Sequence, residues 1–156
     1  GALQRLAINA DNKVAIAKAG GIAPLVALAR DGTDGQKEYA AAALVNLACD
    51  NADNQVAIAK EGGIAPLVAL ARDGSDRQKQ WAAMALRNLA INADNQVAIA
   101  RAGGIAPLVA LARDGTDGQK EWAAWTLHNL AANADNRVAI ARVGGIAPLV
   151  ALARDG

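Results

Sequence analysis

Apolar and polar positions follow one pattern that returns four times along the chain. The segment GGIAPLVALARDG begins at glycines spaced by 42, 41 and 41 residues, namely Gly20, Gly62, Gly103 and Gly144. No stretch alternates apolar and polar residues over more than a few positions, as half-buried strands do. A period near 40 residues is typical of stacked helices or of propeller blades. The pattern therefore predicts an all-α solenoid with no sheet.

Start and stop signals divide each repeat into three helices. We expect the first to run from about Asn54 to Lys60, with Asp53 as its N-cap and a Gly-Gly pair as its stop. A second helix begins at Pro66, whose missing N–H costs nothing at the first helical position, and ends at Asp73-Gly74. A third, longer helix begins with a capping box in which Ser or Thr precedes Gln by three residues. The boxes are Thr33 with Gln36, Ser75 with Gln78, and Thr116 with Gln119.

These signals predict a single domain over residues 1–156. Residues 2–9 are expected to be the end of a third helix, residues 10–51, 52–92 and 93–133 to be complete repeats, and residues 134–156 to be the first two helices of a further repeat. Neither end reads as the polar cap that solenoids need. Two uncapped and complementary ends favour head-to-tail self-association.

The order of these features resembles one known repeat family. A short helix, a Gly-Gly break, a second helix with Pro-Leu-Val and a long third helix ending in Leu-x-Asn-Leu-Ala are similar to the armadillo repeat, over nearly all of residues 2–156. The resemblance implies a right-handed superhelix with three helices per repeat of 41–42 residues. It also implies that the third helices line a concave groove, which holds an extended peptide.

Comparison of the three complete third helices separates two faces. The positions that differ fall within an arc of roughly 120° of the helix, and they are Gly35/Arg77/Gly118, Glu38/Gln80/Glu121, Tyr39/Trp81/Trp122, Ala42/Met84/Trp125 and Val45/Arg87/His128. The positions that stay fixed include Ala40, Ala41, Leu44, Leu47 and Ala48. Because packing tolerates little change of volume, we expect the fixed face to be core and the variable face to be a binding surface.

One position on the variable face does not vary. It is asparagine in each complete repeat, at Asn46, Asn88 and Asn129. A side-chain amide can bind both the N–H and the C=O of an extended peptide. The resemblance assigns it that role, together with a tryptophan one turn earlier, and the full pair is present at Trp125 and Asn129. Alternatively, the asparagines could hydrogen-bond a neighbouring helix end, and the other aromatic residues could pack between successive third helices.

The candidate peptide contacts therefore combine aromatic, amide and charged side chains. They are Asn46, Asn88, Asn129, Tyr39, Trp81, Trp122, Trp125, Met84, Arg77, Arg87, His128, Glu38 and Glu121. Arg77, Arg87 and His128 are also consistent with solvated charges at the rim of the groove. Since the arginines offset the glutamates, a strongly basic peptide is not clearly favoured. Mixed or apolar side chains able to lie against indole fit better, and a peptide arginine could bind there through a cation–π contact.

Composition excludes several other classes of function. With 16 Lys and Arg against 15 Asp and Glu, the chain has no electrostatic footprint for nucleic acid or an anionic membrane. Trp81 and Trp122 could stack on bases, but Glu38 and Glu121 would repel phosphate. One histidine, one cysteine and one serine assemble neither a nucleophile–base pair nor a zinc site. We therefore expect a soluble, non-enzymatic protein with no cofactor, metal or small-molecule substrate.

Two further expectations concern the origin of the protein and its cellular compartment. The near-identity of the repeats indicates recent duplication, a consensus sequence or a designed protein, so an engineered array without an evolved ligand is the alternative to a peptide binder. A single cysteine and apolar runs of no more than eleven residues, as at 19–29, favour an intracellular protein, in the cytoplasm or nucleus.

Overall fold

The structure is a computed structural model that describes residues 20–144 and 146–155. These residues form ten α-helices and no strand. In chain order the helices are α3 (Ile22–Asp31), α4 (Asp34–Ala48), α5 (Ala52–Lys60), α6 (Ile64–Asp73), α7 (Asp76–Leu89), α8 (Ala93–Arg101), α9 (Ile105–Asp114), α10 (Asp117–Leu130), α11 (Ala134–Arg142) and α12 (Ile146–Asp155). The predicted third-helix end at residues 2–9 and the start of the 10–51 repeat lie outside the described residues.

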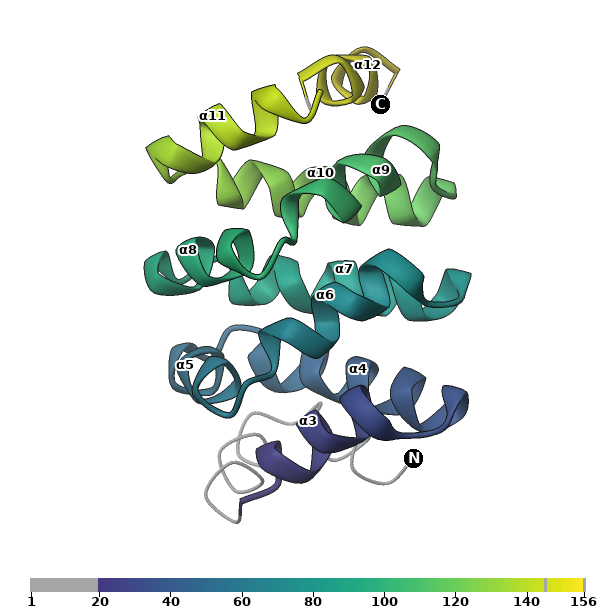
Figure 1. Cartoon of the computed structure of the whole chain (residues 1–156), viewed down its shortest axis with the longest axis vertical. Helices are drawn as coiled ribbons and strands as arrows, with labels where there is room; N and C mark the ends of the chain where they lie inside the picture. Colours follow the sequence, from purple (N-terminus) through teal and green to yellow (C-terminus); the bar gives the residue numbers. More distant parts are fainter. Residues whose placement is uncertain (1–19, 145, 156) are drawn as a thin grey trace.

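The helices recur as triplets that stack along the long axis of the molecule (Figure 1). The third helices of successive triplets pack against one another, so α7 lies between α4 and α10. The second helices α3, α6 and α9 pack on the third helices of their own repeats. Within the described residues the predicted all-α solenoid is confirmed.

The first helix of each repeat begins earlier than predicted. The N-cap of α5 is Asn51, whose side chain accepts a hydrogen bond from the backbone N–H of Asn54 at 2.9 Å. Asn92 and Asn133 cap α8 and α11 in the same way. The prediction that Asp53 is the N-cap is wrong, because Asp53 lies in the first turn, where its charge favours the positive end of the helix dipole.

The second helix also begins two residues before the predicted start. It starts at Ile64, so Pro66 occupies the third helical position and not the first. Proline does not mark the first helical position uniquely. The first four N–H groups of any helix lack an intrahelical partner, so proline is tolerated throughout the first turn. The predicted stop at Gly74 and all three predicted capping boxes are confirmed.

The two glycines of the Gly103-Gly104 pair have different roles. Gly103 has a φ of 81°, a conformation that side chains rarely adopt, and this residue ends α8. Gly104 has an ordinary φ of −76°. A Cβ atom added there would collide with Ile99 and would be tightly packed against Val68 of the preceding repeat. The pair therefore sets both the turn and the approach of neighbouring repeats.

A ladder of buried amides links the first helices along the stack. Asn95 Nδ2 donates to the carbonyl oxygens of Leu89 at 3.0 Å and Gln55 at 3.2 Å. Asn136 makes the corresponding pair of bonds to Leu130 and Gln96. Each asparagine thus ties its own helix to the end of the preceding third helix and to the preceding first helix.

The described helices are short compared with the thickness of a membrane. Among the described residues, no one helix is long and apolar enough to cross it. Only α8 and α9 taken together reach that length and hydropathy, and they are bent by 86° at their junction. Ile99 of α8 and Leu108 of α9 are fully buried inside the stack.

Candidate functional site

The variable positions of α4, α7 and α10 form what we call the third-helix face. The fixed positions of α4 and their equivalents in α7 are buried, as predicted. In α10, Ala123, Leu127 and Leu130 are buried, whereas Ala124 and Ala131 are half-buried. The prediction that every variable position lies outside the core is wrong at Ala42 and Val45, which are buried. A short side chain between longer neighbours lies below the surface that they form. At the same position in the next repeats, Met84 is half-buried and Trp125 is exposed.

The aromatic candidates differ in accessibility. Tyr39 is 59% exposed and Trp125 is 43% exposed. Trp81 and Trp122 are half-buried and pack against the core, as the structural alternative anticipated. Arg77, Glu121 and His128 are exposed, whereas Glu38 and Arg87 are half-buried.

Three of the candidates meet in one cluster on α7 and α10. The rings of Trp122 and Trp125 are stacked, with centroids 5.7 Å apart and planes inclined by 5°. The guanidinium carbon of Arg87 lies 4.0 Å from the ring centroid of Trp125 and 5.9 Å from that of Trp122. This is the geometry of a cation–π interaction. The cluster therefore already contains a cation, supplied by the protein itself.

The asparagines of the third-helix face hydrogen-bond to the preceding repeat. Asn88 Nδ2 donates to the carbonyl oxygen of Val45 at 3.0 Å, and Asn129 Nδ2 donates to that of Arg87 at 3.2 Å. The structural role that the sequence left open is thus present at both residues. Asn88 is 5% exposed, and its Oδ1 accepts a hydrogen bond from Arg87 Nη1 at 2.9 Å. Asn46 and Asn129 are half-buried, and peptide contact by the asparagines stays a prediction.

The charges on this face are partly compensated. Arg77 Nε lies 3.0 Å from Glu38 Oε1, an ion pair that joins α7 to α4. Because the Arg77 side chain is 77% exposed, the pair adds at most about 1 kcal/mol to stability. Among the described residues, neither Arg87 nor Glu121 has an oppositely charged atom within 4.0 Å. One unpaired positive and one unpaired negative group therefore remain on the third-helix face.

Sequence reasoning missed a second contact made by the capping-box glutamines. Gln78 Nε2 donates to the carbonyl oxygen of Asp34 at 2.9 Å, and Gln119 Nε2 donates to that of Asp76 at 2.9 Å. Each glutamine therefore caps its own helix and ties it to the first turn of the preceding third helix. The sequence signal for this contact is that the residue is glutamine in all three complete repeats.

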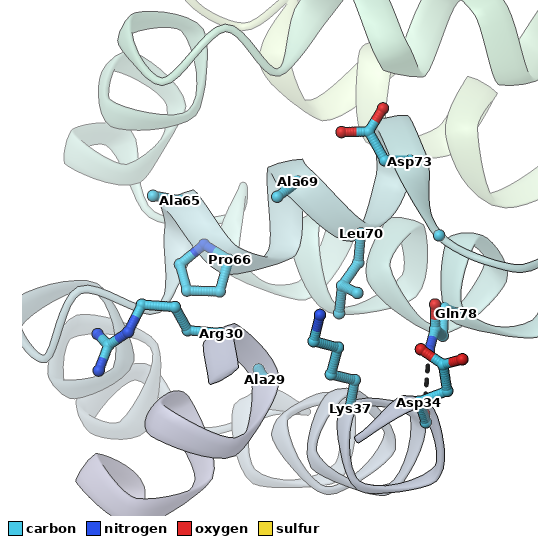
Figure 2. A pocket seen from close by; sticks show the side chains of 11 residues that line it. Ala29, Arg30, Asp34, Lys37, Ala65, Pro66, Ala69, Leu70, Asp73 and Gln78 are labelled. Carbon is cyan, nitrogen blue, oxygen red and sulfur yellow. Dashed lines mark hydrogen bonds between the residues drawn. The ribbon is translucent and has the colours of Figure 1, made fainter. Parts of the chain in front are cut away.

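The sequence also missed two equivalent clefts at the repeat junctions. They have volumes of about 400 and 470 Å³ and lie between consecutive second helices and the first turns of the third helices. Figure 2 shows the first cleft, where Lys37 extends from α4 toward Leu70 of α6. None of the predicted contact residues lines either cleft. Because each cleft combines residues about 40 positions apart, no local motif indicates it.

A metal site has no support in the described residues. No group of three or more His, Cys, Asp or Glu side chains there is arranged to hold a metal ion.

Comparisons with known proteins agree with these observations. The sequence pattern of the armadillo/beta-catenin-like repeat matches residues 9–49 and 92–132. A designed armadillo repeat protein in complex with the peptide (KR)4 is 28% identical, with a TM-score of 0.89 over 96% of this chain and 64% of that chain. Computationally designed armadillo repeat proteins for modular peptide recognition give 29% identity and a TM-score of 0.90, over 96% of this chain and 64% of that chain. An engineered protein gives 33% identity and a TM-score of 0.90, over 96% and 62%.

This chain matches only part of each of these three proteins. The chain spans somewhat less than two thirds of the length of each of the three. No curated protein matches it.

Proposed function

The chain belongs to the armadillo/beta-catenin-like repeat family, and we propose that it is a non-enzymatic scaffold whose third-helix face binds an extended peptide. The observation that carries the proposal is the exposed Trp125 ring one turn before Asn129. No described residue donates a hydrogen bond to Asn129 Oδ1, so this oxygen is available to a peptide N–H. The designed relatives made for modular peptide recognition support the same reading.

Trp125 and Asn129 would bind different parts of a peptide. The part of the Trp125 indole that Trp122 and Arg87 leave exposed offers a rigid surface to one side chain, and an amide oxygen binds main chain of any sequence. Asn88 is placed differently, because Arg87 covers its amide oxygen. We therefore propose that Asn129 and Trp125 make the strongest contacts, and that a peptide reaches Asn88 only by displacing Arg87.

Truncation of the indole tests this proposal. A peptide is first selected from a random library on the purified chain, and its binding is measured by calorimetry. We expect Trp125→Ala to weaken binding by a factor of about ten or more, as at binding hot spots, and Asn129→Ala to weaken it by a smaller factor. The matched control is Ile91→Ala, which truncates an exposed apolar side chain outside the third-helix face. If the original chain and Trp125→Ala bound the peptide with equal affinity, the proposal would be refuted.

A second candidate function is head-to-tail association between copies of this chain. Ile146 and Val150 of α12 are 59% and 50% exposed, whereas the equivalent Ile105 and Val109 of α9 are buried at 6% and 2%. An exposed apolar surface that matches an interior surface of the same molecule favours contact with a second copy. We propose that α12 packs against a second copy of this chain through Ile146 and Val150.

Light scattering across a dilution series tests the association. The mass is expected to rise above 15.8 kDa with concentration, and Val150→Asp is expected to hold it at that value, because a buried unpaired carboxylate opposes the contact. The control is Ile91→Asp, which places the same charge on an exposed position away from α12. A mass that stays at 15.8 kDa at every concentration rules the association out.

A further inference from the structure

The Arg87 guanidinium is the least compensated polar group on the third-helix face. Its Nη1 donates to Asn88 Oδ1 at 2.9 Å, and its Nε is buried without an acceptor among the described residues. No carboxylate of the described residues lies within 4.0 Å of it. A half-buried cation without a counter-charge raises the free energy of the site, and an anion that approaches it lowers that energy.

The same side chain occupies the best cation site of the face. Arg87 lies 4.0 Å over the Trp125 ring, where a ligand lysine or arginine would otherwise bind. Such a ligand residue would have to displace Arg87, losing its hydrogen bond to Asn88, and two cations would then compete for one ring. A ligand carboxylate meets no such obstacle, because the outer N–H groups of a guanidinium form a fork that matches its two oxygens.

This arrangement is confined to one repeat. The equivalent position is Val45 in the preceding repeat and His128 in the following one. Arg77, the other arginine of α7 on this face, is already paired with Glu38 at 3.0 Å. Arg87 is therefore the single described arginine of the face that is held in place by neighbours and still lacks an acidic partner.

We propose that Arg87 is a specificity-determining residue, which makes the bound peptide carry aspartate or glutamate at the position facing the Trp122–Trp125 stack. This inference rests on the proposed peptide binding. The Arg87 side chain both repels a basic residue from the Trp125 ring and pairs with an acidic one.

A substitution scan of a peptide selected on the original chain tests the inference. Each peptide position is replaced in turn by Glu, Gln, Ala and Lys, and the affinities are measured for the original chain and for Arg87→Gln. At one position we expect Glu to bind about tenfold more tightly than Gln or Lys, as charged pairs at interfaces do. Arg87→Gln keeps a donor for Asn88 and is expected to abolish this preference.

Further variants separate charge from shape and from folding. Arg87→Glu is expected to invert the preference toward Lys, and Arg87→Lys to keep it in weakened form. Arg113→Gln, the matched control, removes an arginine outside the third-helix face that is already paired with Asp114 and is expected to leave the preference intact. Circular dichroism of each variant verifies that it retains the helical fold.

Each result bears on the inference in a defined way. A preference for Lys in the original chain, or a preference for Glu that persists in Arg87→Gln, overturns the inference while the peptide-binding proposal stands. If Trp125→Ala leaves the affinity of the same peptide unchanged, the peptide-binding proposal and this inference fall together.

Discussion

Gly104→Ala is expected to lower the free energy of unfolding by about 2–3 kcal/mol, the upper part of the range for overpacking. A Cβ atom there would lie 2.7 Å from Ile99 Cγ2, 3.0 Å from the Ile99 carbonyl oxygen and 3.2 Å from Val68 Cγ2. The carbonyl cannot move away freely, because it accepts the Gly104 N–H at 2.9 Å. Val68 belongs to the preceding repeat, so relief of the clash would separate two repeats. Urea unfolding followed by circular dichroism measures the effect.

Two other glycines of the same chain provide matched controls. Gly35 lies in the first turn of α4 with open space where a Cβ atom would be added, and Gly118 would meet only the flexible end of Gln80. Gly35→Ala is expected to raise the free energy of unfolding by about 0.5–1 kcal/mol, because alanine favours the helix. Gly118→Ala is expected to change it little. If Gly104→Ala were as stable as Gly35→Ala, the close approach of repeats at Gly104 would be refuted.

Asn95→Ala is expected to lower the free energy of unfolding by about 2–3 kcal/mol, since two buried carbonyl groups lose their donor. Asn95 is 3% exposed and bonds to Leu89 and Gln55 through the same amide nitrogen. The cavity left by the side chain adds to the loss. Because Gln55 belongs to the preceding repeat, the substitution weakens a contact between repeats as well as one within a repeat.

Asn129→Ala is the natural comparison for Asn95→Ala. It removes the same side chain, but from a half-buried site with one hydrogen bond of 3.2 Å to Arg87. We expect a loss of about 1 kcal/mol or less, the usual net value of a single hydrogen bond. Both losses are measured by the same urea unfolding. Equal losses would show that the buried hydrogen bonds of Asn95 add no more stability than the half-buried bond of Asn129.

The sequence predicts the fold well because its signals are local and are repeated. The capping box at Ser75 and Gln78, the stop at Gly74 and the Gly-Gly turn each act within a few residues, and each is found in the structure. The errors are also local. Asn51 and Asp53 are both acceptable N-caps, and only the backbone conformation selects Asn51.

The candidate site is less predictable because it depends on contacts between repeats. Variation along the third helix identifies Trp125 as exposed, and the structure agrees. It does not reveal that Arg87 lies over Trp125 from the neighbouring helix, or that Asn88 is covered. Asn88 is covered by its direct neighbour Arg87, whose side-chain direction the sequence does not give. Arg87 and Trp125 are about 40 positions apart, and their contact follows from how α7 and α10 pack. The clefts at the repeat junctions were missed for the same reason.

The central claim is that the third-helix face binds the peptide, and amide and indole chemical shifts of the chain titrated with a selected peptide test it most directly. Each of the three tryptophans carries one indole N–H that reports on its own surroundings. The account predicts that Trp122 and Trp125 shift most, together with the backbone amide of Asn129, while Ala69 and Ala110 in the clefts at the repeat junctions stay unchanged. Shifts concentrated at Ala69 and Ala110, with the indole signals unmoved, would contradict it.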